Sequence, residues 1–166
     1  MKGIVCISSE GYIGFENKIP WYSNLDFDFF QKITIGKGNN AVIMGRKTYD
    51  SIRNVPLKKR RNYIITRDSN KSWIYKQDVI VEQTVENLFF LHLFFDDVFV
   101  IGGAEIYSLF APYIDTWYVT HIHNYSHGDI KFPVDLSSFE KKVIDERYDE
   151  QFQEMTFCEY SRKIEK

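Results

Sequence analysis

An aspartate, Asp26, stands among phenylalanines in the stretch SNLDFDFFQKI. If a helix begins at the start of this stretch, the face that carries the acid also carries apolar residues at i+3, i+4 and i+7, namely Phe29, Phe30 and Ile33. A carboxylate in such surroundings is desolvated, which raises its pKa and makes it a candidate for acid–base chemistry. Asp26 is therefore the first candidate catalytic residue.

The same acid also has a structural interpretation. Ser23 and Asp26 match a capping box, in which the serine bonds the backbone of the third helical residue and the acid bonds back. Trp21, directly after Pro20, and the long loop upstream favour the functional interpretation. Thr120, in the strand-like segment TWYVTHIH, could hydrogen-bond a buried acid. Local sequence leaves both interpretations open.

Histidine and cysteine spacings do not predict a metal site. His121 and His123 would share one face of a strand, but no further histidine, cysteine or acid completes a zinc ligand set. Cys6 and Cys158 each lie in an apolar, strand-like context and form neither a disulfide framework nor a metal spacing. We expect no bound metal, and a reducing cytoplasm as the location.

A strand-to-helix junction with a Gly-Gly pair has the form of a phosphate-binding turn. In VFVIGGAEIY (98–107), Gly102 and Gly103 would let a ligand approach the backbone, and the helix start offers free N–H groups to an anion. Such turns also occur without a ligand. The segment lacks the G-x-G-x-x-G fingerprint, so an ordinary Rossmann dehydrogenase is not supported.

Cations mark a second junction, AVIMGRKTYDSI (41–52). Arg46 and Lys47 would oppose the dipole in the first turn of a helix, and a bound phosphate would relieve that conflict. The spacing is not that of a Walker loop, so a kinase is not supported. With the cluster KKRRN (58–62) and Arg67, the cations indicate a ligand with several anionic groups, although charge runs are also common on plain surfaces.

Short β-rich runs alternate with helix-like segments through most of the chain. The expected strands are 2–8, 40–45, 62–66, 78–82, 97–103, 116–123 and runs near 143–148 and 155–161. The expected helices lie at about 24–35, 47–53, 85–94 and 104–111. Several strands are apolar throughout, as strands covered on both faces are. The order predicts an α/β fold with a largely parallel sheet and an antiparallel edge added last.

The irregular segment 8–23 follows the first strand. Ligands of open α/β sheets bind outside the carboxyl ends of the strands, and this loop leaves from such an end. A loop of this length favours a mobile cover over a cleft, with a plain surface loop as the alternative. The Phe-rich segment 89–95 is expected to be helix core, with a partner surface as the alternative.

Size and charge exclude several classes of protein. At 166 residues the chain is long enough for one domain with a full core, and we expect residues 1–166 to form that single domain. A formal net charge of −2 does not indicate the basic surface that nucleic-acid binding requires. No run reaches the ~18 apolar residues of a membrane span, and the N-terminus lacks the features of a signal peptide.

Taken in order, these pieces resemble dihydrofolate reductase nearly end to end. The motifs are the opening strand, IGFENKIPW (13–21) with Asp26 five residues past Trp21, VIMGRKTYDSI (42–52), RRNYIITR (60–67), VFVIGGAEIY (98–107), WYVTHI (117–122) and GDIKFP (128–133). The resemblance implies a single-domain, twisted, mixed eight-stranded sheet, mostly parallel with an antiparallel C-terminal edge strand and flanked by about four helices. It implies NADPH-dependent reduction of 7,8-dihydrofolate to 5,6,7,8-tetrahydrofolate, a reaction of one-carbon metabolism.

The resemblance also assigns residues to the substrate. Asp26 matches the carboxylate that holds the pterin amidine edge and assists protonation of N5, and Thr120 matches the hydroxyl that bonds this acid; Trp21 completes the catalytic set. Arg60 matches the arginine that grips the glutamate carboxylate. The implied substrate-binding residues are Ile4, Val5, Cys6, Asp26, Phe27, Phe30, Ile52, Leu57, Arg60, Ile101, Tyr107 and Thr120.

For the cofactor NADPH, the resemblance implies a mobile loop, two phosphate-binding turns and a Gly-Gly peptide bond in the cis form. Arg46, Lys47 and Arg67 are the candidates for the 2′-phosphate. The implied cofactor-binding residues are Cys6, Ile13, Gly14, Ile19, Gly45, Arg46, Lys47, Thr48, Thr66, Arg67, Ile101, Gly102, Gly103, Ala104, Glu105, Ile106 and Tyr107.

Two departures from the family pattern are visible. Lys58-Lys59 replaces the usual Pro-Gly, with one residue inserted nearby, which leaves the choice between Arg60 and Arg61 open. Glu105 stands where some relatives place a cation. The resemblance implies a monomer that binds antifolates and dihydrofolate; Lys58-Lys59 could add recognition of polyglutamate tails, or be plain surface charge.

Two other functions stay open. A reductase of the same fold that acts on another pyrimidine or pterin, as in riboflavin synthesis, would share the Gly-Gly turn but lack the spacing between Trp21 and Asp26. A non-catalytic module that binds folate or NADPH is the second, and the pair of Asp26 and Thr120 argues against it.

Overall fold

A mixed sheet forms the centre of the computed structural model, which describes residues 1–14, 16, 21–68, 79–125 and 127–163. Among these residues the sheet has eight strands in the order β5-β4-β3-β6-β1-β7-β10-β9. The strands are β1 (Lys2–Ser8), β3 (Asn40–Gly45), β4 (Arg60–Ile65), β5 (Val79–Glu82), β6 (Val98–Val100), β7 (Thr116–Ile122), β9 (Phe139–Tyr148) and β10 (Glu154–Arg162). Neighbours pair in parallel from β5 to β7, and β10 pairs antiparallel with both β7 and β9. The predicted fold class is confirmed.

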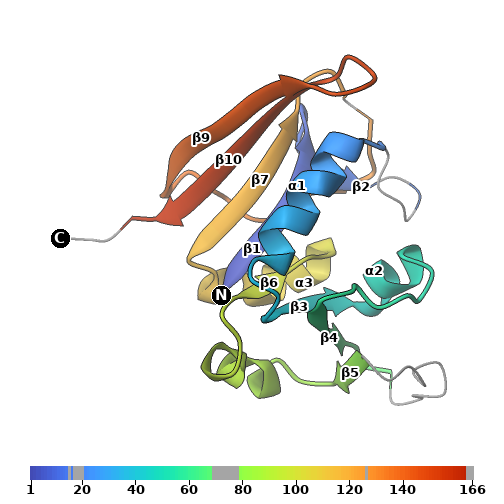
Figure 1. Cartoon of the computed structure of the whole chain (residues 1–166), viewed down its shortest axis with the longest axis vertical. Coiled ribbons are helices and arrows are strands. Elements are labelled where there is room, and N and C mark those ends of the chain that lie inside the picture. Colours follow the sequence, from blue (N-terminus) through green and yellow to red (C-terminus); the bar gives the residue numbers. More distant parts are fainter. Residues whose placement is uncertain (15, 17–20, 69–78, 126, 164–166) are drawn as a thin grey trace.

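Helices cover both faces of this sheet. The described helices are α1 (Asn24–Ile35), α2 (Arg46–Ser51), α3 (Ala104–Phe110) and the 3₁₀ segments η1 (Glu86–Leu93) and η2 (Ala111–Tyr113). Figure 1 shows α1 in front of the sheet beside β1 and β7, with α2 following β3. α1 packs into an apolar cluster with Ile4, Met44 and Phe99, whereas α3 and η1 pack on the other face with Val5 and Ile43.

Side-chain alternation along β1 sorts its residues between these two layers. Ile4 and Cys6 contact the clusters on the α1 side, and Val5 and Ile7 belong to the cluster on the α3 side. The period of two in a strand produces this separation. Cys6 is therefore placed on the same side of the sheet as α1.

Segment 85–94, expected to be a helix, forms the 3₁₀ helix η1 instead. Its fully packed residues, Leu88 and Leu91, are three apart, which places them on one face at three residues per turn. Phe90 and Phe94 are exposed, so only part of this Phe-rich segment is core.

The loop after β1 contains a short strand that the sequence did not predict. β2 (Tyr12–Gly14) pairs antiparallel with β8 (Ile130–Lys131). Gly128 permits this approach, because a Cβ atom there would lie 2.3 Å from Cβ of Tyr12. The first half of segment 8–23 is thus anchored to the region before β9. No helix in the described residues is long and apolar enough to cross a membrane.

Candidate active site

The strand order reverses between β1 and β6. β1 pairs with β6 only at Lys2 and Gly3, while it pairs with β7 along its whole length. Beyond Gly3 the two strands part, and the Tyr107 hydroxyl donates to the Ile4 carbonyl oxygen at 2.7 Å in this gap. Ligands of open α/β sheets bind at such a switch point.

Asp26 lies in the first turn of α1 and faces the sheet. Ser23 is the N-cap of this helix, and its hydroxyl oxygen accepts from the backbone N–H of Asp26 at 3.3 Å. The side chains of Thr120 and Cys6 are polar neighbours of the carboxyl group and lower its pKa in part. The structure thus combines one half of the capping box with the functional interpretation of the acid.

Burial governs the proton affinity of Asp26. Desolvation raises the pKa of its carboxyl group above the ordinary value, while the side chains of Thr120 and Cys6 lower it in part. Ionisation of Asp26 is therefore disfavoured relative to an exposed aspartate. A carboxyl group that holds its proton closer to neutral pH is suited to assist a protonation step.

Trp21 closes the side of the site next to α1. Its indole is 8% exposed and packs edge-on against Tyr125, with ring centroids 5.3 Å apart. The indole nitrogen lies near the Cys6 thiol and makes no close hydrogen bond within the described part of the chain. A buried donor in this position is available to a ligand or a water molecule.

Arg60, not Arg61, points toward α1. The Arg60 side chain is 7% exposed, and its guanidinium donates to Thr34 Oγ1 at 2.8 Å and to the Lys58 carbonyl at 2.9 Å. It also lies over the ring of Phe30, 5.8 Å from the centroid. Arg61 is exposed.

The guanidinium of Arg60 is a buried cation without a counter-charge. Burial lowers the pKa of Arg60 to about 10, so the group stays charged at neutral pH. No ion pair to it is found among the described residues, although a buried charge is costly unless it is paired. The arrangement suits an anionic group of a ligand.

Two helix starts meet on the other side of this switch point. The Gly45 N–H donates to the Gly102 carbonyl at 2.9 Å, which joins the N-cap of α2 to the turn before α3. The Gly102–Gly103 peptide bond is cis, as the resemblance implied. A Cβ atom on Gly103 would lie 3.8 Å from Thr48 Oγ1, so the first turn of α2 borders the same turn. The residues expected at the cofactor pyrophosphate are brought together here.

Acidic residues accompany the cations expected at the 2′-phosphate. Arg46 forms ion pairs with Asp68 and with Asp50. Arg67 pairs with Glu105 at 3.1 Å, and both side chains are largely exposed. These surface pairs are weak and leave the arginines able to exchange partners.

Several other predicted residues lie on the side of the sheet that α1 covers. Phe30, Ile52, Leu57 and Ile101 pack partly buried against the cluster under α1. Phe27 is 51% exposed, as a residue that meets a ligand rather than the core can be. Ile13 packs on the α3 side, and Gly14 is buried against Ile130. Ile19 lies outside the described residues.

Sequence reasoning missed three partners in this site. Thr34 bonds Arg60, Asp68 pairs with Arg46, and Cys6 is a polar neighbour of Asp26. Thr34 carried a signal: it lies eight residues after Asp26 on the same helix face. The partners of Arg46 and Asp26 depend on contacts between distant segments.

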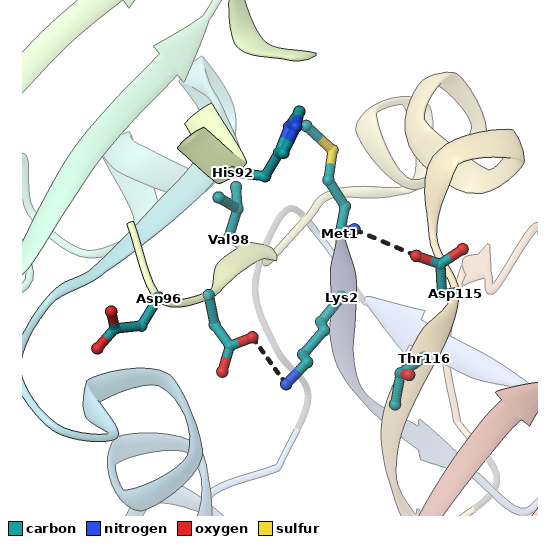
Figure 2. A pocket seen from close by; sticks show the side chains of 8 residues that line it. Met1, Lys2, His92, Asp96, Val98, Asp115 and Thr116 are labelled. Atoms are coloured by element: carbon teal, nitrogen blue, oxygen red, sulfur yellow. Dashed lines mark ion pairs between the residues drawn. The ribbon is translucent and has the colours of Figure 1, made fainter. Parts of the chain in front are cut away.

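A cavity of about 240 Å³ lies at the opposite end of the sheet. Its lining includes Lys2, Val98 and Thr116, which begin β1, β6 and β7. Figure 2 shows two ion pairs at its border, from the Met1 amino group to Asp115 at 3.5 Å and from Lys2 to Asp97 at 2.8 Å. None of the predicted site residues lines it. Within the described residues no cluster of His, Cys, Asp or Glu could hold a metal ion.

The structure is thus that of an α/β protein with a switch point in its sheet, the partly buried Asp26 carboxylate on one side and the cis Gly102–Gly103 turn on the other. The family model for dihydrofolate reductase matches residues 1–162. The chain belongs to the dihydrofolate reductase family.

Individual relatives agree with this assignment. The dihydrofolate reductase of Staphylococcus haemolyticus is 38% identical over 131 residues, which cover 79% of this chain and 75% of that one. That of Haemophilus influenzae is 32% identical over 157 residues, 90% and 93% of the two chains. A solved structure of dihydrofolate reductase from Enterococcus faecalis, complexed with NADP(H) and RAB-propyl, matches with a TM-score of 0.84 at 29% identity and covers 98% of this chain and 96% of its own.

Proposed function

We propose that this chain reduces 7,8-dihydrofolate to 5,6,7,8-tetrahydrofolate with NADPH, and that Asp26 is its catalytic acid. The observation that carries the proposal is the desolvated Asp26 carboxylate in the first turn of α1, with Thr120 and Cys6 as its polar neighbours. Its two oxygens can accept paired hydrogen bonds from the amidine edge of a pterin. Its raised pKa favours the protonated form that assists transfer of a proton to N5.

The buried arginine supports the substrate class. A dihydrofolate molecule has a flat ring system at one end and a glutamate carboxylate at the other. Asp26 lies in the first turn of α1, and the Arg60 guanidinium is bonded to Thr34 in the last turn. The length of the helix therefore separates the acid from the guanidinium. The buried, unpaired cation would bind the carboxylate through a bidentate fork.

The paired helix starts support the cofactor. NADPH supplies a hydride when it is bound. The N–H groups at the starts of α2 and α3 can bind its pyrophosphate, Thr48 Oγ1 lies beside that turn, and Arg46, Lys47 and Arg67 would bind the 2′-phosphate. Of the remaining proposed contacts, Ala104 and Ile106 are in the first turn of α3, and Thr66 follows Ile65, the register partner of Gly45.

Several finer assignments belong to the same proposal. We propose a monomer that works in the cytoplasm, with residues 1–166 as one domain. Two free cysteines accord with a reducing compartment. Lys58 and Lys59 are exposed next to Arg60, where they could meet the added glutamates of a polyglutamylated substrate.

An assay of NADPH oxidation tests the proposed substrate directly. The absorbance of NADPH is followed with dihydrofolate and, in parallel, with an aminouracil substrate of the riboflavin type. We expect oxidation with dihydrofolate alone. Turnover only with the aminouracil would assign the chain to the other reductase, and binding without turnover in both arms would make it a non-catalytic module.

A further inference from the structure

An acidic side chain holds the first arginine of α2. Arg46 is the first residue of this helix, and Asp68 lies shortly after the end of β4. The Asp68 carboxylate accepts a hydrogen bond from Nη1 of Arg46 and forms an ion pair with it. The two segments are adjacent because β3 and β4 pair in parallel up to Gly45 and Ile65. The contact therefore lies where the carboxyl ends of two neighbouring strands meet.

Both edges of the Arg46 guanidinium that could bind a phosphate already face a carboxylate. Asp68 accepts from Nη1, and Nε lies 3.7 Å from an oxygen of Asp50, one turn further along α2. A bidentate contact with a phosphate uses Nη2 together with either Nη1 or Nε. Each choice includes an atom that is next to one of these acids. A phosphate that forms two hydrogen bonds with Arg46 therefore competes with an internal carboxylate.

A second arginine at the same end of the sheet has an acidic partner of its own. Arg67 donates from Nη2 to Glu105 Oε1 at 3.1 Å, and Glu105 lies in the first turn of α3. Arg60 differs from both arginines, because none of the ion pairs among the described residues involves it. The chain thus supplies counter-charges to the arginines of one proposed anion site and not to the arginine of the other.

We propose that Asp68 is a specificity-determining residue for the cofactor: it competes with a 2′-phosphate for the Arg46 guanidinium and so limits the preference for NADPH over NADH. Glu105 has the same role toward Arg67. The inference rests on the proposed function, because NADPH and the place of its 2′-phosphate belong to that proposal. The two ion pairs themselves do not depend on it.

The exposure of the two ion pairs ranks their effects. The side chains of Arg46 and Asp68 are 43% and 34% exposed, whereas those of Arg67 and Glu105 are 89% and 74% exposed. Exposed pairs contribute little to stability and exchange partners readily, so neither pair prevents a phosphate from binding. Each carboxylate still offsets part of the attraction that its arginine offers to the phosphate. Water screens the less exposed pair less, so the effect of Asp68 should be the larger one.

The dissociation constants of NADPH and NADH, measured by the fluorescence of the bound nicotinamide, are the direct readout. NADH lacks the 2′-phosphate, so the ratio of the two constants isolates the contribution of that group. We expect Asp68→Asn to tighten NADPH binding by about three- to fivefold and to leave NADH binding unchanged. Glu105→Gln should shift the ratio in the same direction by less. Glu140→Gln, which removes the same charge at an exposed site on β9, at the opposite edge of the sheet, should change neither constant.

A double-mutant cycle separates competition for Arg46 from plain repulsion of the phosphate. Arg46→Gln should weaken NADPH binding, because the 2′-phosphate loses a cation. In that background Asp68→Asn has no guanidinium to release, so its gain in affinity should shrink well below the gain seen with Arg46 present. An equal gain in both backgrounds would overturn the proposal, since the acid would then act without the arginine. An unchanged ratio of the two constants in Asp68→Asn would overturn it as well.

Glu105→Gln keeps the proposal testable if Asp68→Asn does not fold, because its ion pair is largely exposed. An unchanged ratio of the two constants in Glu105→Gln would then overturn the proposal. The proposed function is judged separately, by reduction of dihydrofolate. Variants that show the expected ratios without reducing dihydrofolate would contradict the proposed function alone, and a wild-type chain that binds neither nucleotide would overturn both.

Discussion

At the scale of single residues, the site depends on two groups whose charge state burial controls. Desolvation favours the protonated form of Asp26. The Arg60 guanidinium is also desolvated, and it has no acidic partner among the described residues. One group is suited to deliver a proton and the other to bind an anion. Asp26 is in the first turn of α1, and Arg60 of β4 is hydrogen-bonded to Thr34 in the last turn, so the length of the helix separates the two groups.

The choice between Arg60 and Arg61 leads to a prediction. Arg60→Ala should raise the KM for dihydrofolate by about 10- to 100-fold, the usual loss for a charge-assisted hydrogen-bonded contact. Its kcat should change little, because Arg60 is remote from Asp26. Arg61→Ala, the matched control on the exposed side of β4, should leave steady-state kinetics unchanged. A larger KM effect in Arg61→Ala would show that Arg61, not Arg60, is the arginine that binds the glutamate carboxylate.

Periodicity in the sequence was sufficient to find some of these residues. The apolar face of α1 predicted a desolvated Asp26, and burial does raise the pKa of its carboxyl group. The pairing of Cys6 with Thr120 was not predictable, because it follows from the register of β1 against β7, which are far apart in the chain. Local pattern likewise cannot show that Asp68 would meet Arg46.

At the scale of elements, the hairpin of β9 and β10 holds the start of α1. The Asn24 N–H donates to Glu150 Oε1 at 2.8 Å, and the Ser23 hydroxyl lies 3.4 Å from the sulfur of Met155. The hairpin turn is itself held by Asp149, whose Oδ1 accepts from two backbone N–H groups. The position of Asp26 thus depends on the C-terminal strands.

Removal of the cap tests this link. Ser23→Ala should lower the free energy of unfolding by about 1 kcal/mol, because the Asp26 N–H loses its acceptor. It should also reduce turnover, since the first turn of α1 carries the acid. Ser108→Ala, at an exposed site in α3, is the control and should alter neither denaturant unfolding nor turnover. Stability equal to wild type in Ser23→Ala would contradict the role of the cap.

Long apolar runs made the main strands predictable, whereas short or mixed elements were not. The predicted bounds of β1 and β3 match the structure, because both strands are apolar nearly throughout. β2 and β8 are three and two residues long and form only against each other, so neither has a local signature. The 3₁₀ form of η1 reflects packing of Leu88 and Leu91, which propensity does not encode.

At the scale of the whole molecule, the face of the sheet away from α1 carries another partly buried ionisable group, His121. Its ring nitrogen Nε2 lies 2.9 Å from the Tyr160 hydroxyl. Burial first, and then Lys141 and His123, lower the pKa of His121 to about 4. The folded protein therefore binds this proton less readily than the unfolded chain does.

The sign of this shift predicts acid sensitivity. Because the folded pKa is below the unfolded value, the stability that His121 contributes is complete above about pH 6.5 and is lost as the pH falls toward 4. The loss should be roughly 1 to 2 kcal/mol after allowance for partial exposure. Denaturant unfolding at several pH values should show a flatter profile in His121→Gln than in wild type. His92→Gln, at an exposed site, should keep the wild-type profile, and an equal slope in His121→Gln would contradict the prediction.

Asp26→Asn tests the central claim most directly, because it removes the proton and keeps the shape of the side chain. At neutral pH we expect turnover of dihydrofolate with NADPH to fall by at least about 100-fold. The fold and the affinity for NADPH should be retained, and stability at neutral pH should not fall, because a desolvated carboxylate is replaced by a neutral amide. Full turnover in a correctly folded Asp26→Asn enzyme would contradict the assignment of Asp26 as the catalytic acid.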